Sequence, residues 1–333
     1  MIAALKGLWP GVLACAVVAA AAAFLGEHYG APTMLFALLL GLALNFLAEQ
    51  GPCGAGIQFA ARHLLRLGVA LLGLRITTAQ VAGLGWQPAL LVLGGVAATI
   101  TVGVLAARAF GYRVFFGLLT GGAVAICGAS AALAIAAALP RHPLREQATL
   151  FTVIGVSVLS TLAMVVYPMV AAAAGLDAAQ TGVFLGATIH DVAQVVGAGY
   201  GVSAATGDVA TVVKLLRVAL LMPVILLVAL VARRHGNAAD GGTRPPLLPG
   251  FVIGFVVLVA LNSAGWVPAP LARGGAQLAS VCLVAAIAAI GMKTQLRDLL
   301  QVGWRPVALI VGETLFLAAL VLAALAAGVS PRG

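Results

Sequence analysis

Long apolar runs separated by short polar connections fill almost the whole chain. The runs are continuous and do not alternate with period two, as the strands of a membrane barrel would, so they predict helices that cross a lipid bilayer. Eleven runs can be distinguished, at about 8–25, 32–48, 57–74, 87–107, 114–139, 147–173, 180–199, 209–232, 249–265, 274–292 and 305–328. The pattern predicts an all-α integral membrane protein with about eleven transmembrane helices, folded as one polytopic domain over residues 1–333.

The composition excludes a water-soluble fold. Hydrophobic residues make up 63% of the chain and charged residues 8%, whereas a soluble domain carries about a quarter of charged residues. The first run follows Lys6 and has the composition of a signal peptide. Further runs follow it directly, which favours a first transmembrane helix over a signal peptide.

The formal net charge of +9 does not indicate nucleic-acid binding, because the basic residues are scattered over the connections between spans. Cationic connections are typical of the cytoplasmic side of a membrane protein. With eleven crossings, eleven of the 18 Lys and Arg residues fall on the side of the N-terminus and seven on the other. The excess favours a cytoplasmic N-terminus. The narrow margin indicates either a miscounted span or cations that serve a function.

Two stretches of the chain look like one segment written twice. Residues 73–88 (GLRITTAQVAGLGWQP) match residues 291–306 (GMKTQLRDLLQVGWRP) at two Gly, one Trp and one Pro position, and Arg75 matches Lys293 in charge. An odd number of spans lies between them, so the two copies are expected to run in opposite directions. Inverted repeats are typical of secondary transporters, although membrane connections can also share such residues by chance.

The duplication predicts inverted-repeat segments near 57–107 and 274–328, with a core site region at 114–232 between them. The offset of 218 residues exceeds half the chain. Either the duplication is therefore partial, or the second copy is permuted and its helix break lies in an earlier span, such as 182–199. Arg75 and Lys293, at equivalent ends of the repeated helices, are expected at the membrane interface.

The fifth run contains TGGAVAICGASAALAIAAALP at residues 120–140, with several glycines where a helix centre is expected. Each glycine costs about 1 kcal/mol of helix stability relative to alanine. We interpret the run as a broken helix with Ser130 near the N-cap of its second half, where free N–H groups suit an anion. The alternative is close helix packing through small residues. The substrate-binding candidates here are Gly122, Cys127, Gly128, Ala129 and Ser130.

The seventh run contains His190, Asp191 and Gln194. Ionisable groups inside a span are rare and commonly functional. His190 and Gln194 are four residues apart and would share one helix face, so both are substrate-binding candidates. His190 and Asp191 are candidates for ion coupling. The alternative is a span that begins later and leaves the pair as an exposed cap.

Two cations and one acid fall in later runs. Lys214 and Arg217 are three residues apart and share one helix face. They are expected to act as electrostatic partners at the entrance of an anion site, or else to extend to the interface. Glu313, in the eleventh run, can pair with a cation or carry protons. We find no zinc spacing, nucleotide loop or nucleophile elbow, so the sequence predicts no metal site and no enzyme.

Four ordered stretches carry a family resemblance: AICGASA (125–131), GATIHDVAQV (186–195), DVATVVKLLRVALLMPV (208–224) and AAIGMKTQLRDL (288–299). They resemble the signature stretches of the YeiH-type, or sulfate exporter, family of bacterial inner-membrane proteins, over nearly the whole chain. The family commonly has Glu where Asp191 stands. It is similar to cation/proton antiporters and bile-acid sodium symporters. The resemblance therefore implies a panel domain and a core domain whose two broken helices cross at the midplane.

The sequence thus predicts a secondary transporter of a small anion such as sulfate, sulfite or a sulfonate. It would work by alternating access in the bacterial inner membrane, coupled to H⁺ or Na⁺ and without a cofactor. The expected partners are the anion and the lipid bilayer, and a homodimer is compatible with the chain. A cation/proton antiporter with Asp191 as its Na⁺ ligand, or a sensor or channel without coupled transport, are the alternatives.

Overall fold

The apolar runs form helices in the computed structural model, which describes residues 2–29, 32–49, 51–139, 145–234, 250–294 and 304–329. Seven helical segments in this part of the chain are long and apolar enough to cross a membrane, and shorter apolar helices accompany them. The described residues contain no strand. The predicted all-α membrane class is confirmed, whereas the count of eleven transmembrane helices is not.

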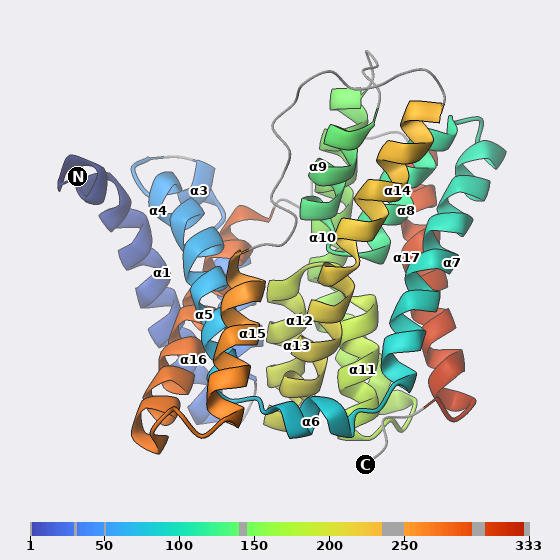
Figure 1. Ribbon diagram of the computed structural model, residues 1–333. Coiled ribbons are helices and arrows are strands. Elements are labelled where there is room, and N and C mark those ends of the chain that lie inside the picture. The colour runs from blue at the N-terminus through green and yellow to red at the C-terminus, as the bar shows by residue number, and fades with distance from the viewer. Residues whose placement is uncertain are drawn as a thin grey trace.

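The helices form two groups that stand side by side (Figure 1). We call the first group the panel. It contains α1 (Ile2–Tyr29), α2 (Thr33–Ala43), α3 (Phe46–Glu49), α4 (Gly54–Phe59), η1 (Ala60–Leu64), α5 (Leu65–Leu71), η2 (Leu72–Leu74), α15 (Gly250–Ser263) and α16 (Ala269–Lys293).

We call the second group the core. It contains α7 (Gln87–Ala109), α8 (Val114–Ala125), α9 (Ala129–Ala138), α10 (Arg145–Ala173), α11 (Ala178–Thr188), α12 (Val192–Val202), α13 (Ala204–Ala219), α14 (Leu221–Arg234) and α17 (Trp304–Ala326). The short helix α6 (Thr78–Gly83) connects the panel to the core along the lower edge in Figure 1.

The fifth run is broken as predicted, but its two halves fold back on each other. A side chain at Gly122 in α8 would collide with Ile135 of α9, which lies 13 residues further along the chain. A helix that continued in one direction would hold these residues about 20 Å apart. α8 and α9 therefore form a re-entrant hairpin, which we call hairpin 1.

The seventh run forms a second hairpin, hairpin 2, from α11 and α12. Gly182 and Gly186 of α11 face Val209 and Val213 of α13, so these two helices run parallel. Gly199 of α12 faces Gly207 near the start of α13, so those two helices run antiparallel. α11 and α12 therefore run in opposite directions, and the break between them falls inside the range 182–199.

Two opposed hairpins replace the crossing helices that the family resemblance implied. Hairpin 1 occupies the upper half of the core in Figure 1, and hairpin 2 occupies the lower half. Each hairpin enters and leaves the core on one side, which explains why eleven apolar runs do not make eleven crossings. Irregular backbone at the two breaks is tolerated at membrane depth only because protein covers it.

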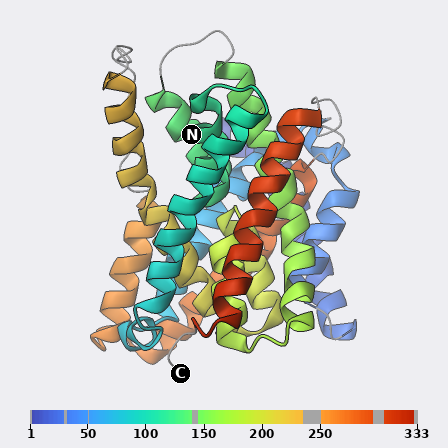
Figure 2. The same cartoon turned by 90° about the vertical axis from the view of Figure 1, so that its right-hand side faces the viewer.

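α7 and α17, which follow the two copies of the repeated segment, run in opposite directions. α7 rises from α6, and α17 descends toward the C-terminus (Figure 1). The two helices contact each other on one outer face of the core (Figure 2). Trp86 and Trp304 at their starts are exposed, as expected for side chains at a membrane interface.

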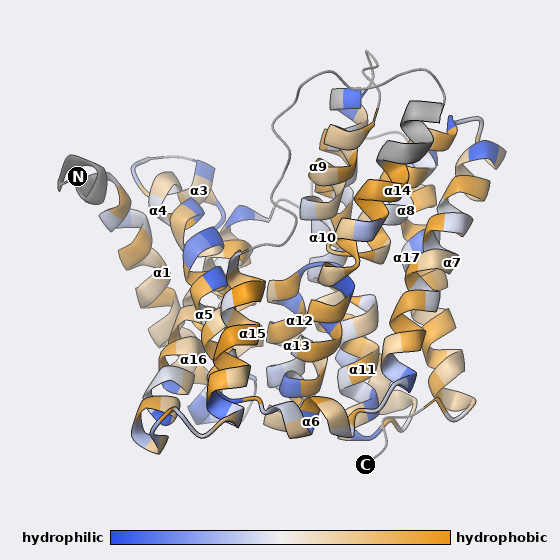
Figure 3. Cartoon of the chain, in the orientation of Figure 1, coloured by the Kyte–Doolittle hydropathy of each residue, from blue (hydrophilic) through white to orange (hydrophobic). Residues whose placement is uncertain are grey.

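Small residues let the panel helices approach closely. At the crossing of α2 and α16, a Cβ added to Gly41 would lie 3.0 Å from the Cα of Gly291. Such small-residue contacts are typical of membrane helices, where packing replaces the hydrophobic effect as the driving force. Most of the helix ribbons are coloured hydrophobic in Figure 3, in keeping with contact to lipid.

We expect Gly41→Leu to separate α2 from α16 and to destabilise the panel by about 1–3 kcal/mol, as overpacking of a closed interface does. The melting temperature of the purified protein in detergent measures the effect. Gly94→Leu is the matched control, because nothing lies within 4 Å of a Cβ at Gly94. Equal losses in both variants would contradict the assigned contact.

Candidate functional site

The tips of the two hairpins meet inside the core. The tip of hairpin 1 is Ile126–Gly128, and Gly128 adopts φ 62° and ψ −124°, a conformation that favours glycine. The tip of hairpin 2 is Ile189–Asp191. A Cβ added to Gly128 would lie 3.4 Å from the Cβ of His190, so the two tips are in direct contact.

Lys214, on α13, joins the two tips. Its Nζ donates hydrogen bonds to the carbonyl oxygens of Ile126 (2.8 Å) and Ile189 (3.0 Å), and also to that of His190. These carbonyls lie beyond the C-terminal ends of α8 and α11, where helix geometry leaves C=O groups without partners. One ammonium group therefore satisfies both breaks.

Arg217 lies one turn further along α13 and repeats this arrangement. Its Nε donates to the carbonyl of Ala125 and its Nη2 to that of Val124, both at 2.8 Å. Its Nη1 donates to the carbonyls of Gly186 (3.2 Å) and Ile189 (3.0 Å). The guanidinium thus binds the negative ends of two helix dipoles.

The sequence prediction for these two cations is half right. They share one face of α13, as their spacing indicates. However, Lys214 is 0% exposed and Arg217 is 1% exposed, so they neither extend to the interface nor line an entrance. The carbonyl partners could not be inferred from the sequence, because backbone acceptors leave no signal in it.

His190 is buried in the break and is not part of a helix. Its Nε2 lies 3.0 Å from the Oγ1 of Thr314 on α17. That hydroxyl donates to the carbonyl of Ile310 at 2.8 Å, so it accepts a hydrogen bond from the N–H at Nε2. The Nδ1 of His190 has no partner among the described residues.

Asp191 is the N-cap of α12 and is partly exposed. Its carboxylate accepts a hydrogen bond from the N–H of Ala193 at 2.8 Å, and its own N–H donates to the Oγ of Ser160. The cap interpretation is therefore right for Asp191, while the buried His190 contradicts it. Asp191 is thus a half-buried acidic group at the tips.

Gln194 lies in the first turn of α12. Its Nε2 is 3.4 Å from the Oγ1 of Thr161 on α10, and its Oε1 has no partner in the described chain. The expectation that His190 and Gln194 share a helix face is wrong, since residues 189–191 are not helical. Ser160, Thr161 and Thr314 support the tips and were missed, because isolated hydroxyl residues in apolar runs are too common to single out.

The N-terminus of α9 is open. Gly128 is its N-cap and provides no side-chain hydrogen bond. Cys127 is buried, whereas Ala129 is half-buried and Ser130 is exposed. The sequence predicted Ser130 to lie near the N-cap of the second half-helix. In the structure the N-cap is Gly128, and Ser130 follows it by two residues. Gly122 lies away from the tip and packs against Ile135 within hairpin 1.

The panel places positive charge opposite the tips. Lys293, at the end of α16, is close enough to Asp191 for their charges to interact, and it lies within range of Arg62 in η1. Both cations are exposed. The hydrophilic colours inside the core gather where α12 begins and along α13 (Figure 3). The positive charges of the panel thus lie within electrostatic range of the tip of hairpin 2.

Arg75 closes the opposite edge of the boundary between panel and core. Its Nε lies 3.1 Å from the Oδ1 of Asp208 on α13. Its guanidinium carbon stands 5.3 Å above the ring of Tyr200, whose hydroxyl donates to Asp208 at 2.5 Å. The expected position of Arg75 at the membrane interface does not describe its whole role, because Arg75 also bridges the panel and the core. Asp208 was missed although it opens one of the quoted motifs.

Among the described residues, no group of three His, Cys, Asp or Glu lies together as a metal site requires.

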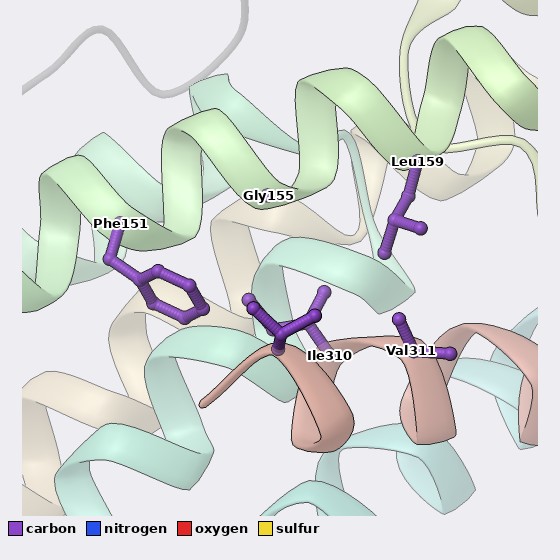
Figure 4. Close-up of a pocket in the computed structure, with 6 residues that line it drawn as sticks. Phe151, Gly155, Leu159, Ile310 and Val311 are labelled. Carbon is purple, nitrogen blue, oxygen red and sulfur yellow. The ribbon is translucent and has the colours of Figure 1, made fainter. Parts of the chain in front are cut away.

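A pocket between α10 and α17 is lined by Phe151, Gly155, Leu159, Val307, Ile310 and Val311 (Figure 4). Its lining is apolar, so it offers no donor to an anion.

These features define a polytopic helical membrane protein with two opposed re-entrant hairpins. The chain belongs to the family described as Conserved hypothetical protein 698, which matches residues 10–310. The relatives are named as UPF0324 membrane proteins, and the family resemblance is thereby confirmed. No solved structure matches the chain.

Three relatives illustrate how far the similarity extends. The chain is 54% identical to a membrane protein of Chlorobaculum tepidum over 315 residues, which cover 94% of this chain and 88% of the relative. It is 56% identical to TauZ of Paracoccus denitrificans over 319 residues, covering 95% and 94%. It is 55% identical to a membrane protein of Rhizobium meliloti over 315 residues, covering 94% and 91%.

We expect Arg217→Met to destabilise the fold strongly, because it leaves the carbonyls of Val124 and Ala125 without their donor. Each buried polar group left unsatisfied costs about 1–3 kcal/mol. Thermal unfolding in detergent measures the loss, and Arg66→Met, which removes an exposed arginine, is the control. Equal melting temperatures for the two variants would disprove the bridging role of Arg217.

Proposed function

We propose that the protein is a secondary transporter that moves a small anion by alternating access, and that it is not an enzyme. The observation that carries the proposal is the meeting of two opposed hairpins around two buried cations. Discontinuous helices near the midplane are where transporters bind their substrates. The catalytic alternative has little support, because no nucleophile and base lie together in the site described above.

The charges at the tips favour an anion. Lys214 and Arg217 bring two positive charges, and Asp191 brings one negative charge. Lys293 and Arg62 add further positive charge from the panel. A cation bound at Asp191 would be repelled by Lys214 and Lys293, which weakens the antiporter alternative. An anion would instead be attracted by the positive potential of these fixed charges.

The open end of α9 supplies the donors. The backbone N–H groups of its first turn have no side-chain cap, and the hydroxyl of Ser130 is exposed beside them. A small oxyanion such as sulfate, sulfite or a sulfonate would accept several of these hydrogen bonds at once. Gln194 and Cys127 lie further inside, and we assign them to the wall of the site.

We propose that panel and core move against each other during transport. The Arg75–Asp208 pair holds them together at one edge, whereas the cations near Asp191 are exposed at the other. Opening the first edge requires the ion pair to break. The carboxylate of Asp191 would then exchange protons with one side of the membrane at a time. Na⁺ is the alternative coupling ion.

The hairpins also sharpen the proposed orientation. When each hairpin enters and leaves on one side, the side of the N-terminus collects Arg62, Arg66, Arg108, Arg113, Arg145, Lys293 and Arg305 among the residues whose side chains the structure describes. The other side collects Arg75 and Arg273, and the buried Lys214 and Arg217 belong to neither. This excess favours a cytoplasmic N-terminus in the bacterial inner membrane, by the positive-inside rule.

Anion flux into proteoliposomes tests the proposal. Radiolabelled sulfate, sulfite and a simple sulfonate should each be offered with and without an imposed pH gradient. We expect saturable uptake of at least one, accelerated by the gradient. Absence of flux for all three, together with a Na⁺-dependent pH change that needs no anion, would replace the anion carrier by the cation antiporter.

We expect Asp191→Asn to uncouple anion flux from the pH gradient, because asparagine retains the N-cap acceptor but cannot bind a proton at this position. Flux with and without the gradient measures the coupling. Asp177→Asn is the matched control, since Asp177 caps the other helix of hairpin 2 at an exposed end. Full gradient dependence in Asp191→Asn would clear this residue of the coupling role.

We expect Arg75→Gln to slow transport by about two- to five-fold, because each cycle must return to the state that the ion pair closes, and a partly exposed pair contributes up to about 1 kcal/mol to that state. Initial rates of uptake measure the change. The double variant with Arg75→Asp and Asp208→Arg restores the attraction and should recover part of the rate. Rates in the double variant no better than in the single variant would exclude the ion pair as a closing contact.

A further inference from the structure

Glu313 is a buried acid that the proposed site does not use. It lies in the middle of α17 and is 1% exposed. α17 packs against α7, α8, α10 and α11. Among the side chains that the structure describes, the titratable or charged residues on these helices and at their ends are Arg108, Tyr112, Arg113, Arg145, Tyr167, Asp177 and, in the adjoining break, His190. Within the described chain, none of them forms an ion pair or hydrogen bond with Glu313.

The surroundings of Glu313 form a small polar niche. Its Oε1 lies 2.8 Å from the Oγ1 of Thr120 on α8. Gly103 on α7 makes room for the carboxyl group, because a Cβ there would lie 2.7 Å from Oε1. The Oγ1 of Thr99, one turn earlier on α7, is buried and has no partner among the described residues.

The surroundings of Glu313 favour its neutral form. The Oγ1 of Thr120 donates to Oε1 at 2.8 Å and also lies 3.1 Å from the carbonyl of Phe116, so its single proton is shared between two acceptors. Oε2 has no described partner. A proton on the carboxyl group therefore removes a buried charge that no described cation balances. An ionised, unpaired carboxylate in this place would be far more costly.

Glu313 is connected to both hairpins. Its own contact reaches Thr120 in hairpin 1. The next residue, Thr314, accepts the hydrogen bond from His190 in the tip of hairpin 2. A change of charge at residue 313 therefore acts on the same turn of α17 that positions the second tip.

We propose that Glu313 is a second proton-binding residue of the transport cycle, whose carboxyl group is protonated while the hairpins are arranged as in this structure. The inference rests on the proposed transport function. Asp191 exchanges protons at the accessible tip, and Glu313 binds one at the junction of α7, α8 and α17. Two such carboxyl groups allow a divalent anion to cross together with two protons and without net charge.

The first experiment tests the protonation state and does not depend on transport. Infrared difference spectra of the full-length protein between neutral and alkaline pH should contain the C=O stretch of a protonated carboxylic acid. Glu313→Gln should lack this band, whereas Glu27→Gln, at an exposed position of α1, should retain it. A band unchanged in Glu313→Gln, or absent from the wild type, would overturn the inference.

The second experiment tests coupling. In proteoliposomes, the pH gradient that balances a known gradient of the transported anion gives the number of protons moved with each anion. Glu313→Gln should still transport but should move one proton fewer, and its flux should become sensitive to membrane potential. Unchanged stoichiometry would overturn the inference. A wild type without any anion flux would instead contradict the proposed function, and the infrared result would stand on its own.

Discussion

The hydrogen bonds from Lys214 and Arg217 to the hairpin tips are the contacts on which the rest of the structure depends. Two helix breaks inside a membrane protein expose backbone carbonyls at a depth where water cannot satisfy them. Seven hydrogen bonds from two neighbouring side chains on α13 satisfy them instead. Because each cation reaches both tips, neither hairpin can shift without breaking contacts to the other, and the core behaves as one unit.

The same contacts give the tips their polarity. The cations bind the C-terminal, negative ends of α8 and α11, and none of their hydrogen bonds reaches α9 or α12. Asp191 caps α12, while Gly128 leaves α9 uncapped. The carbonyl groups carry only partial charges, so two full positive charges are incompletely balanced. The contacts that satisfy the backbone at the two breaks are therefore also the contacts on which our proposal of an anion site depends.

The sequence predicted the elements of this site better than their arrangement. Glycines around residues 121–128 correctly indicated a break, since a helix centre does not otherwise accept them. Local sequence could not tell a broken helix from a hairpin, because Gly128 permits either path. The contact that decides, between Gly122 and Ile135, joins the two halves of the hairpin. Likewise, Arg75 and Asp208 are 133 residues apart, and no periodic pattern connects them.

His190 and Asp191 show how adjacent residues in a break acquire different duties. The backbone leaves the helix at Ile189, so His190 turns toward α17 while Asp191 begins α12. With Thr314 committed to Ile310 as a donor, His190 must provide the proton between them, and its ring is held inside the core. A group so enclosed cannot reach solvent without movement of a tip. Asp191 is half-buried, and it is close enough to Lys214 and Lys293 for their charges to interact. In the transport cycle that we propose, proton exchange therefore belongs to the aspartate, while the histidine keeps hairpin 2 in register with α17.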